Sequence, residues 1–330
     1  MENLQLKGCD LVEKEGLINE WFAVLKTEEL KEEPKQVYVL GVRIVVFRNE
    51  SGVYAFLDLC IHRGSVLSLG KVRDGNLVCP YHAWEYNSEG VCVRIPSLPC
   101  HRAIPLKART KVFQCKEEYG LIWVCIGNEP KQFINYEDFG LPRTKTIVYG
   151  PYEVKANAPR VMENFLDVAH LMFVHEGILG DPNYSEIKDF DVHFMDGKLV
   201  TDKISIFQPI GIMDYTEYVY TVTSPVVARI DKFFPNTENH SSLMIFTLQE
   251  SEEKTKVYML STRNYDLNKR TSDSIEQQNY IFSQDLPIVE NQKPELLPLD
   301  LQAELHLKSD RLSIAYRKWL KELGVKVGTA

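Results

Sequence analysis

Two short motifs in the sequence each combine one cysteine with one histidine. Cys60-Ile61-His62 is a C-x-H motif, and after sixteen intervening residues Cys79-Pro80-Tyr81-His82 is a C-x-x-H motif. Two thiolates and two imidazoles presented by two tight loops form a set of four metal ligands. Zinc accepts these donors, but zinc fingers place both cysteines in one loop and both histidines in the other.

One cysteine and one histidine per loop instead favours a [2Fe–2S] cluster whose two irons differ. Cys60 and Cys79 would bind one iron, and His62 and His82 would bind the other. Because neutral imidazoles replace two thiolates, negative charge is removed and the reduction potential rises. The pattern therefore predicts a one-electron carrier.

A second group of polar residues follows about 80 positions later. Asn164, Asp167 and His170 are spaced i, i+3 and i+6, which places them along one face of a helix. His175 is five residues past His170, so both imidazoles can reach one ion only if the helix distorts or ends between them.

A third ligand for such an ion should be a carboxylate. Two histidines and one Asp or Glu on one face make the open non-haem Fe(II) site that activates O₂. Asp285 lies on the apolar side of a predicted helix at residues 271–291, where an unpaired charge would be costly and a metal would supply its partner. Pro287 is expected to bend that helix. We therefore assign His170, His175 and Asp285 as Fe(II) ligands.

The elements that must position these residues differ between the two halves of the chain. The first half is predicted to consist of short strands, whereas the second alternates helices with a long run of strands. A polar connection at residues 127–142 leads us to place one domain at 1–140, with its core at about 20–127, and a second at 141–330. The principal predicted strands are 37–47, 53–59, 84–86, 91–95 and 121–126, and the predicted helices are 161–170, 271–291 and 310–323.

Composition limits the class of protein. The chain has 330 residues and a net charge of −8, so it lacks the cationic surface that nucleic-acid binding needs. No apolar run is long enough for a membrane span, and Met1–Gly16 has no signal-peptide core. We therefore expect a cytoplasmic protein in a reducing compartment, where its seven cysteines are free thiols or metal ligands.

The two motifs, with Arg63-Gly64, Trp84, Gly90 and Pro96, resemble the Rieske iron–sulfur domain. Ile61 and Ala83 depart from its usual proline and glycine. Together with D-x-x-H-x-x-x-x-H at residues 167–175 and the distant Asp285, the chain resembles catalytic (alpha) subunits of Rieske non-haem iron oxygenases from Trp21 onward. Asn164 is similar to the vanillate and dicamba demethylase branch. Segments such as 160–164, 175–177 and 316–324 resemble the toluenesulfonate methyl-monooxygenase and saxitoxin-pathway hydroxylase group.

This resemblance implies an α+β protein: an all-β Rieske [2Fe–2S] domain followed by a helix-grip (START-like) catalytic domain with an antiparallel sheet. It also implies a homotrimer in which Asp167 bridges a cluster histidine of one subunit to an iron histidine of the next, with Asn164 near the iron. A separate reductase, with or without a ferredoxin, would deliver electrons from NAD(P)H. O₂ would then serve as co-substrate to hydroxylate or O/N-demethylate a small molecule.

Two other functions compete with this prediction. A cis-dihydroxylating dioxygenase shares the iron chemistry, and pocket geometry decides between them. A Rieske electron-transfer protein without oxygenase activity needs only about 100 residues, and the His-His-Asp set would then have no role. The pocket walls are expected to come from the middle strands, where ordinary core packing is an equal alternative for the candidate aromatics Phe207, Tyr218, Tyr220, Phe233 and Phe246.

Overall fold

The computed structural model describes residues 16–210 and 213–330. Cys9 lies outside the described residues, and so does all but the last residue of Met1–Gly16, the segment in which we found no signal-peptide core. The chain divides into two compact units, residues 1–133 with 249–251, and residues 134–248 with 252–330. Each unit is described separately below.

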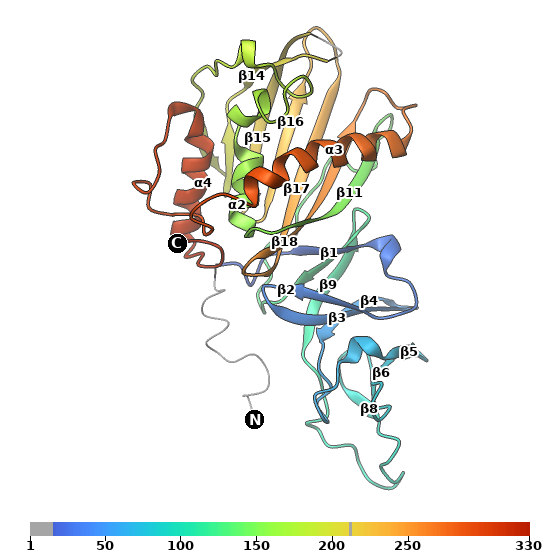
Figure 1. The fold of residues 1–330 in the computed structure, drawn as a ribbon. Helices are drawn as coiled ribbons and strands as arrows, with labels where there is room; N and C mark the ends of the chain where they lie inside the picture. The colour runs from blue at the N-terminus through green and yellow to red at the C-terminus, as the bar shows by residue number, and fades with distance from the viewer. Residues whose placement is uncertain (1–15, 211–212) are drawn as a thin grey trace. The chain divides into compact units, whose positions relative to one another are not determined.

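The N-terminal unit contains a six-stranded antiparallel sheet in the order β1-β10-β9-β4-β3-β2 (Figure 1). Residues 37–47, predicted as one strand, form parts of two, because a hairpin at Leu40 and Gly41 with φ of 51° and 75° separates β2 from β3. The strands are β1 (Phe22–Lys26), β2 (Lys35–Val39), β3 (Val42–Asn49), β4 (Gly52–Leu57), β9 (Val112–Glu118) and β10 (Leu121–Cys125).

A smaller four-stranded sheet in the same unit carries the second Cys-His loop. Its order is β5-β6-β7-β8, and the loop at Cys79–His82 joins its two middle strands. Phe47, Phe56 and Tyr86 belong to a buried hydrophobic cluster that also contains Cys60 and Cys79, so both thiols lie in apolar surroundings. The strands are β5 (Lys71–Arg73), β6 (Asn76–Val78), β7 (Glu85–Tyr86) and β8 (Cys92–Arg94).

The C-terminal unit is built on an eight-stranded antiparallel sheet. The order is β11-β18-β17-β16-β15-β13-β12, and β14 pairs with β15 (Figure 1). This arrangement of helices on an antiparallel sheet confirms the predicted fold class. The strands are β11 (Lys145–Val154), β12 (Val192–Met195), β13 (Lys198–Thr201), β14 (Ile204–Gln208), β15 (Asp214–Ser224), β16 (Val227–Phe233), β17 (His240–Ser251) and β18 (Lys254–Arg263).

Three α-helices pack on this sheet: α2 (Ala158–Leu166) against β16 and β18, α3 (Thr271–Val289) against β11, and α4 (Arg311–Glu322) against β12 and β13. The Asn157 side chain caps α2 by accepting from the Arg160 N–H. α2 ends at Leu166, four residues earlier than predicted, and a separate 3₁₀ turn, Ala169–Met172, follows. Among the described residues, no helix is long and apolar enough to cross a membrane.

Candidate functional site

The two Cys-His loops of the N-terminal unit share one backbone design. In the first, the Gly64 N–H donates to the Cys60 carbonyl at 2.9 Å; in the second, the Ala83 N–H donates to the Cys79 carbonyl at 3.1 Å. Gly64 and Ala83 both have a positive φ, 71° and 55°, so each loop turns back sharply after its histidine. The two turns thus present their Cys-His pairs in the same way. A positive φ carries a steric cost for Ala83 that it does not carry for Gly64.

The side chains of these loops converge. The His62 and His82 ring centroids are 4.5 Å apart, and His62 stacks on Trp84 at 4.5 Å and 8°. The Cys60 sulfur and the Tyr86 hydroxyl are 3.1 Å apart. Both thiols are buried, neither is in a disulfide, and burial raises the pKa of Cys60, which Cys79 raises further.

These residues fit an iron–sulfur cluster. The buried His62 Nδ1 has no hydrogen-bond partner among the described residues, so its lone pair is available to a metal. Two buried thiols become thiolates only if a cation compensates the charge, and the cluster's iron is such a cation. Cys60, Cys79, His62 and His82 are therefore the donors that would hold it.

The C-terminal unit brings His170, His175 and Asp285 together, although Asp285 is more than 100 positions away in the sequence. Asp285 Oδ1 lies 3.2 Å from His175 Nε2 and 3.6 Å from His170 Nε2. The two ring centroids are 5.1 Å apart. One ligand atom from each residue thus faces a common point.

The other nitrogen of each ring is already engaged. His170 Nδ1 lies 2.7 Å from the Asp167 carbonyl, and His175 Nδ1 lies 3.0 Å from Gln284 Oε1. Both partners are acceptors and so favour the proton on Nδ1, which leaves the Nε2 of each neutral imidazole as the atom that would bind a metal. Two lone pairs and a carboxylate oxygen at one point need a cation between them, and this donor set fits Fe(II). Nothing in the sequence marked Gln284.

The pKa values of the two histidines move in opposite directions. Burial lowers the pKa of His170 and exceeds the opposing effects of Asp167 and Asp285. Burial also acts to lower the pKa of His175, but the hydrogen bond and the charge of Asp285 outweigh it and raise that pKa. Asp285 is thus the main electrostatic partner of His175.

The end of α2 explains how two histidines five residues apart reach one point. Because α2 ends at Leu166, His170 is presented by the following 3₁₀ turn rather than by the helix. Gly180 lies against this turn, and a Cβ there would be 2.7 Å from Met172 Cα, so only glycine fits. The five-residue spacing of His170 and His175 required the helix to distort or end, and the structure shows that it ends.

Asn164 and Asp167 lie beside the three ligands. Asn164 Nδ2 donates to Asp285 Oδ1 at 3.4 Å. Asp167 Oδ1 accepts from the Ala169 N–H at 2.8 Å, while Oδ2 lies 3.7 Å from His170 Nδ1. The Asp167 side chain remains 38% exposed, so part of its carboxylate faces outward.

A pocket lies beside the three ligands, with about 700 Å³ of empty space when the part open to solvent is included. Asn164, His170, His175 and Asp285 line it together with mainly apolar side chains. Its apolar walls, with a few polar groups at one side, suit a small organic molecule. The apolar lining residues are Val154, Val161, Phe165, Leu171, Leu179, Tyr218, Ile230, Leu243, Ile245, Met259, Ile281, Phe282, Leu286 and Val289.

Of the five aromatic residues predicted to line the pocket, only Tyr218 does so. Neighbouring residues of a strand face opposite sides of the sheet. Lys232 and Ile245 face the cavity, so Phe233 and Phe246 point to the other side. Tyr220 is fully buried outside the lining, and Phe207 stacks on Tyr184 at 4.0 Å. The prediction for these four positions is therefore corrected.

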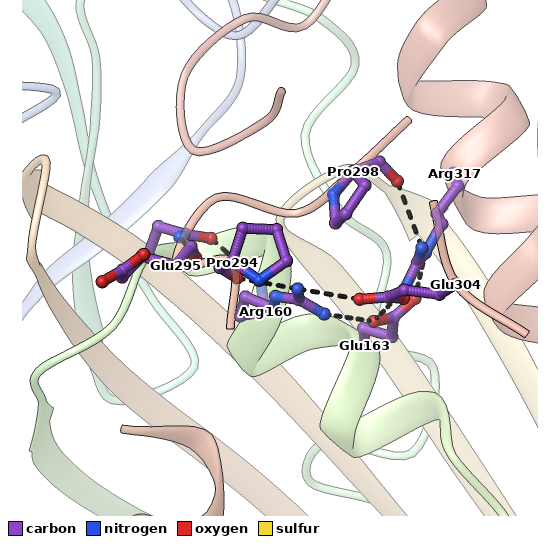
Figure 2. Close-up of polar contacts among 8 residues, drawn as sticks. Arg160, Glu163, Pro294, Glu295, Pro298, Glu304 and Arg317 are labelled. Carbon is purple, nitrogen blue, oxygen red and sulfur yellow. Dashed lines mark hydrogen bonds and ion pairs between the residues drawn. The ribbon is translucent and has the colours of Figure 1, made fainter. Parts of the chain in front are cut away.

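A buried charged cluster anchors α2. Glu163 pairs with Arg317 of α4 at 2.5 Å and with Arg160 at 3.4 Å, and Glu304 pairs with both arginines (Figure 2). The Pro294 and Pro298 carbonyls accept from the same guanidinium groups. These bonds tie α2 to α4 and to the segment between α3 and α4. They hold in place the helix that carries Asn164.

Two family models match the chain. The model described as the Rieske [2Fe-2S] domain matches residues 20–114, and the model described as the vanillate O-demethylase oxygenase C-terminal domain matches residues 154–326. The second match alone spans more than half of the chain.

Full-length relatives agree with these models. Methylxanthine N1-demethylase NdmA of Pseudomonas putida is 30% identical, with 94% of this chain and 90% of the relative covered. The solved structure of P. putida CBB5 NdmA with caffeine is 28% identical at a TM-score of 0.86, covering 94% of this chain and 92% of that one. Dicamba monooxygenase bound to dicamba, 22% identical with 93% and 97% covered and a TM-score of 0.79, shows the same fold.

Proposed function

The chain belongs to the Rieske non-haem iron oxygenases with a catalytic domain of the vanillate O-demethylase type, and we propose that it removes a methyl group from nitrogen or oxygen of a small organic substrate. It is an oxidoreductase of the monooxygenase class, as the sequence predicted. When bound, the cluster supplies electrons singly and the mononuclear iron activates O₂, so that one oxygen atom enters a C–H bond and the other leaves as water.

The observation that carries this proposal is the position of the three ligand atoms at the wall of an apolar cavity. His170, His175 and Asp285 would hold Fe(II), which would supply O₂ activation beside a substrate in the cavity. The apolar walls exclude water from the reacting methyl group. Asn164 orients the Asp285 carboxylate, and Gln284 orients His175.

The role of the cavity is to hold one methyl group at this wall. A methyl group on nitrogen or oxygen that gains a hydroxyl collapses to formaldehyde and the demethylated product. The balanced reaction consumes one O₂, two electrons and two protons, and yields formaldehyde, demethylated substrate and water. We propose that electrons come from NAD(P)H through a separate reductase, with or without a ferredoxin.

We also propose the assembly that the family resemblance implies. Residues 1–140 form the cluster domain and residues 141–330 the iron domain. Three chains form a ring in which Asp167 links His82 of one subunit to His170 of the next. The exposed part of the Asp167 carboxylate, close to His170, supports this role.

The test is product analysis with the iron-loaded protein, a reductase and a panel of O-methyl and N-methyl compounds that includes caffeine and 4-methoxybenzoate. We expect one formaldehyde for each O₂ consumed with at least one compound. With ¹⁸O₂, a product that retains two labelled atoms would identify dihydroxylation and reject the proposal. An iron content of about two per chain instead of about three would indicate an electron carrier.

A further inference from the structure

One cationic side chain lines the apolar part of the cavity. Lys232 on β16 lies directly opposite Tyr218 of β15 in the register of the sheet, and both line the cavity. Lys232 Nζ is 4.7 Å from the centroid of the Tyr218 ring. The cation and the tyrosine therefore form one local pair in the wall of the cavity.

Neither polar group of this pair is satisfied within the part of the chain that the structure describes. The Tyr218 hydroxyl is buried and has no hydrogen-bond partner. Lys232 has neither a hydrogen bond nor an ion pair among these residues, and burial lowers its pKa. A buried hydroxyl without a partner and a half-buried ammonium among apolar side chains both cost free energy, so the pair beside this cavity points to a ligand.

The charge of the cavity indicates the sign of that ligand. Asp285 is the only acidic residue among the lining residues, and a divalent iron there would more than neutralise it. Lys232 is the one lysine or arginine among the residues that line the cavity. The ammonium thus adds positive charge to a site that already has an excess, and an anionic oxygen would offset it.

We propose that Lys232 and Tyr218 bind the carboxylate of an anionic substrate whose methyl group faces His170, His175 and Asp285. The inference rests on the proposed demethylation and names its substrate class: a methoxy- or N-methyl-substituted ring acid. The ammonium pairs with one carboxylate oxygen and the Tyr218 hydroxyl donates to the other. The apolar walls enclose the ring.

Binding is tested without turnover, by anaerobic calorimetry on the iron-loaded protein. The probes are matched pairs of ring acid and carboxamide, including 4-methoxybenzoate with 4-methoxybenzamide and an N-methylated ring acid with its amide. Because a charge-assisted hydrogen bond is stronger than a neutral one, the wild type should bind the acid of at least one pair about tenfold more tightly. Equal affinity within every pair, or no binding of any acid, overturns the proposal.

The Lys232→Met variant should lose this acid preference, and Lys232→Arg should keep part of it. Lys203→Met is the matched control, because Lys203 is an exposed lysine of the same unit that pairs with Glu217 outside the cavity. An unchanged acid preference in Lys232→Met would show that the lysine only covers the Tyr218 ring, and would overturn the proposal.

Stability gives a readout that a structural role would not produce. Because Tyr218→Phe removes a buried hydroxyl without a partner and Lys232→Met removes an unpaired, half-buried ammonium, each variant should melt at or above the wild-type temperature without ligand. Tyr218→Phe should also weaken acid binding about three- to tenfold. A lower melting temperature for both variants contradicts the proposal. If formaldehyde is released only from neutral substrates, the proposed demethylation stands and only the proposed binding of a carboxylate is rejected.

Discussion

At the scale of single residues, Gln284 fixes the orientation of a proposed iron ligand. Its side-chain oxygen holds the Nδ1 proton of His175 at 3.0 Å and so turns Nε2 toward Asp285. We expect Gln284→Leu to lower iron affinity about 10- to 100-fold, measured by competition with a chelator. Gln277→Leu, an exposed position on the same helix, should have no effect. Equal affinities of the two variants would remove this role.

The carboxylate itself is tested by Asp285→Ala. Two histidines alone leave the ion without its charged ligand, so the iron content should fall from about three to about two per chain. The visible absorption of the cluster should stay unchanged, because the cluster ligands lie in the other unit. Glu276→Ala, an exposed acid of α3, is the control. Full iron occupancy in Asp285→Ala would reject the assignment.

Residue type and spacing predicted the ligands, but not what holds them. Asp285 could be predicted because a carboxylate on the apolar side of a helix needs a partner. Gln284 could not be predicted, because its side chain is uncharged and its position on the helix therefore does not require a partner. The predicted pocket aromatics failed for another reason. Phe233 and Phe246 each follow a residue that lines the cavity and so face the other side of the sheet, and the sequence does not say which of two alternating sets of side chains faces the cavity.

At the scale of elements, the sequence predicted that the helices exist but did not predict where the helix that matters for the site, α2, ends. The segments 271–291 and 310–323 were predicted within two residues of α3 and α4. The end of α2 at Leu166 was missed because residues 167–170 continue an apolar pattern of helical period, while Asp167 accepts a local bond from the Ala169 N–H instead. The local hydrogen bond of Asp167 thus ends α2 although the apolar periodicity continues, and this end is what lets both histidines reach the site.

The buried charged cluster between α2 and α4 predicts that one substitution strongly lowers the stability of the fold. Arg317→Met removes the closest partner of the buried Glu163 and leaves only the longer contact to Arg160. We expect a loss of about 3 kcal/mol in the free energy of unfolding, measured with urea, because an incompletely paired buried charge is costly. Lys318→Met, the exposed neighbour on α4, should change stability by less than about 0.5 kcal/mol.

The same cluster predicts a pH dependence. Burial acts to raise the pKa of Glu304, but the hydrogen bonds from Arg317 and Arg160 outweigh it and lower that pKa below 4.5. A carboxyl group whose pKa is lower in the folded state stabilises the protein above its unfolded pKa and loses this effect as the pH falls through the folded value. Glu304→Gln should therefore be destabilised at pH 7, with the difference shrinking below about pH 4.5 in urea unfolding. A constant difference would contradict this.

At the scale of the whole molecule, the proposed activity depends on how chains assemble. A carboxylate that accepts from the partner subunit's His82 and lies beside His170 would shorten the electron route between the two metal centres. In the chain alone, the Asp167 carbonyl rather than its carboxylate holds the His170 Nδ1 proton, so the carboxylate is not needed to orient the iron ligand. Its exposed part is free to serve a second chain.

Asp167→Asn separates these roles, because the amide oxygen can still accept the Ala169 N–H bond that Asp167 Oδ1 makes. We expect both metal centres and the mass of three 38.0 kDa chains to be retained, while turnover falls by at least about 100-fold. Single-turnover reduction of the cluster should remain normal, because only the transfer onward to the iron site is affected. Normal multiple turnover in this variant, or a monomeric wild type with full activity, would show that electrons reach the iron without a bridge between subunits.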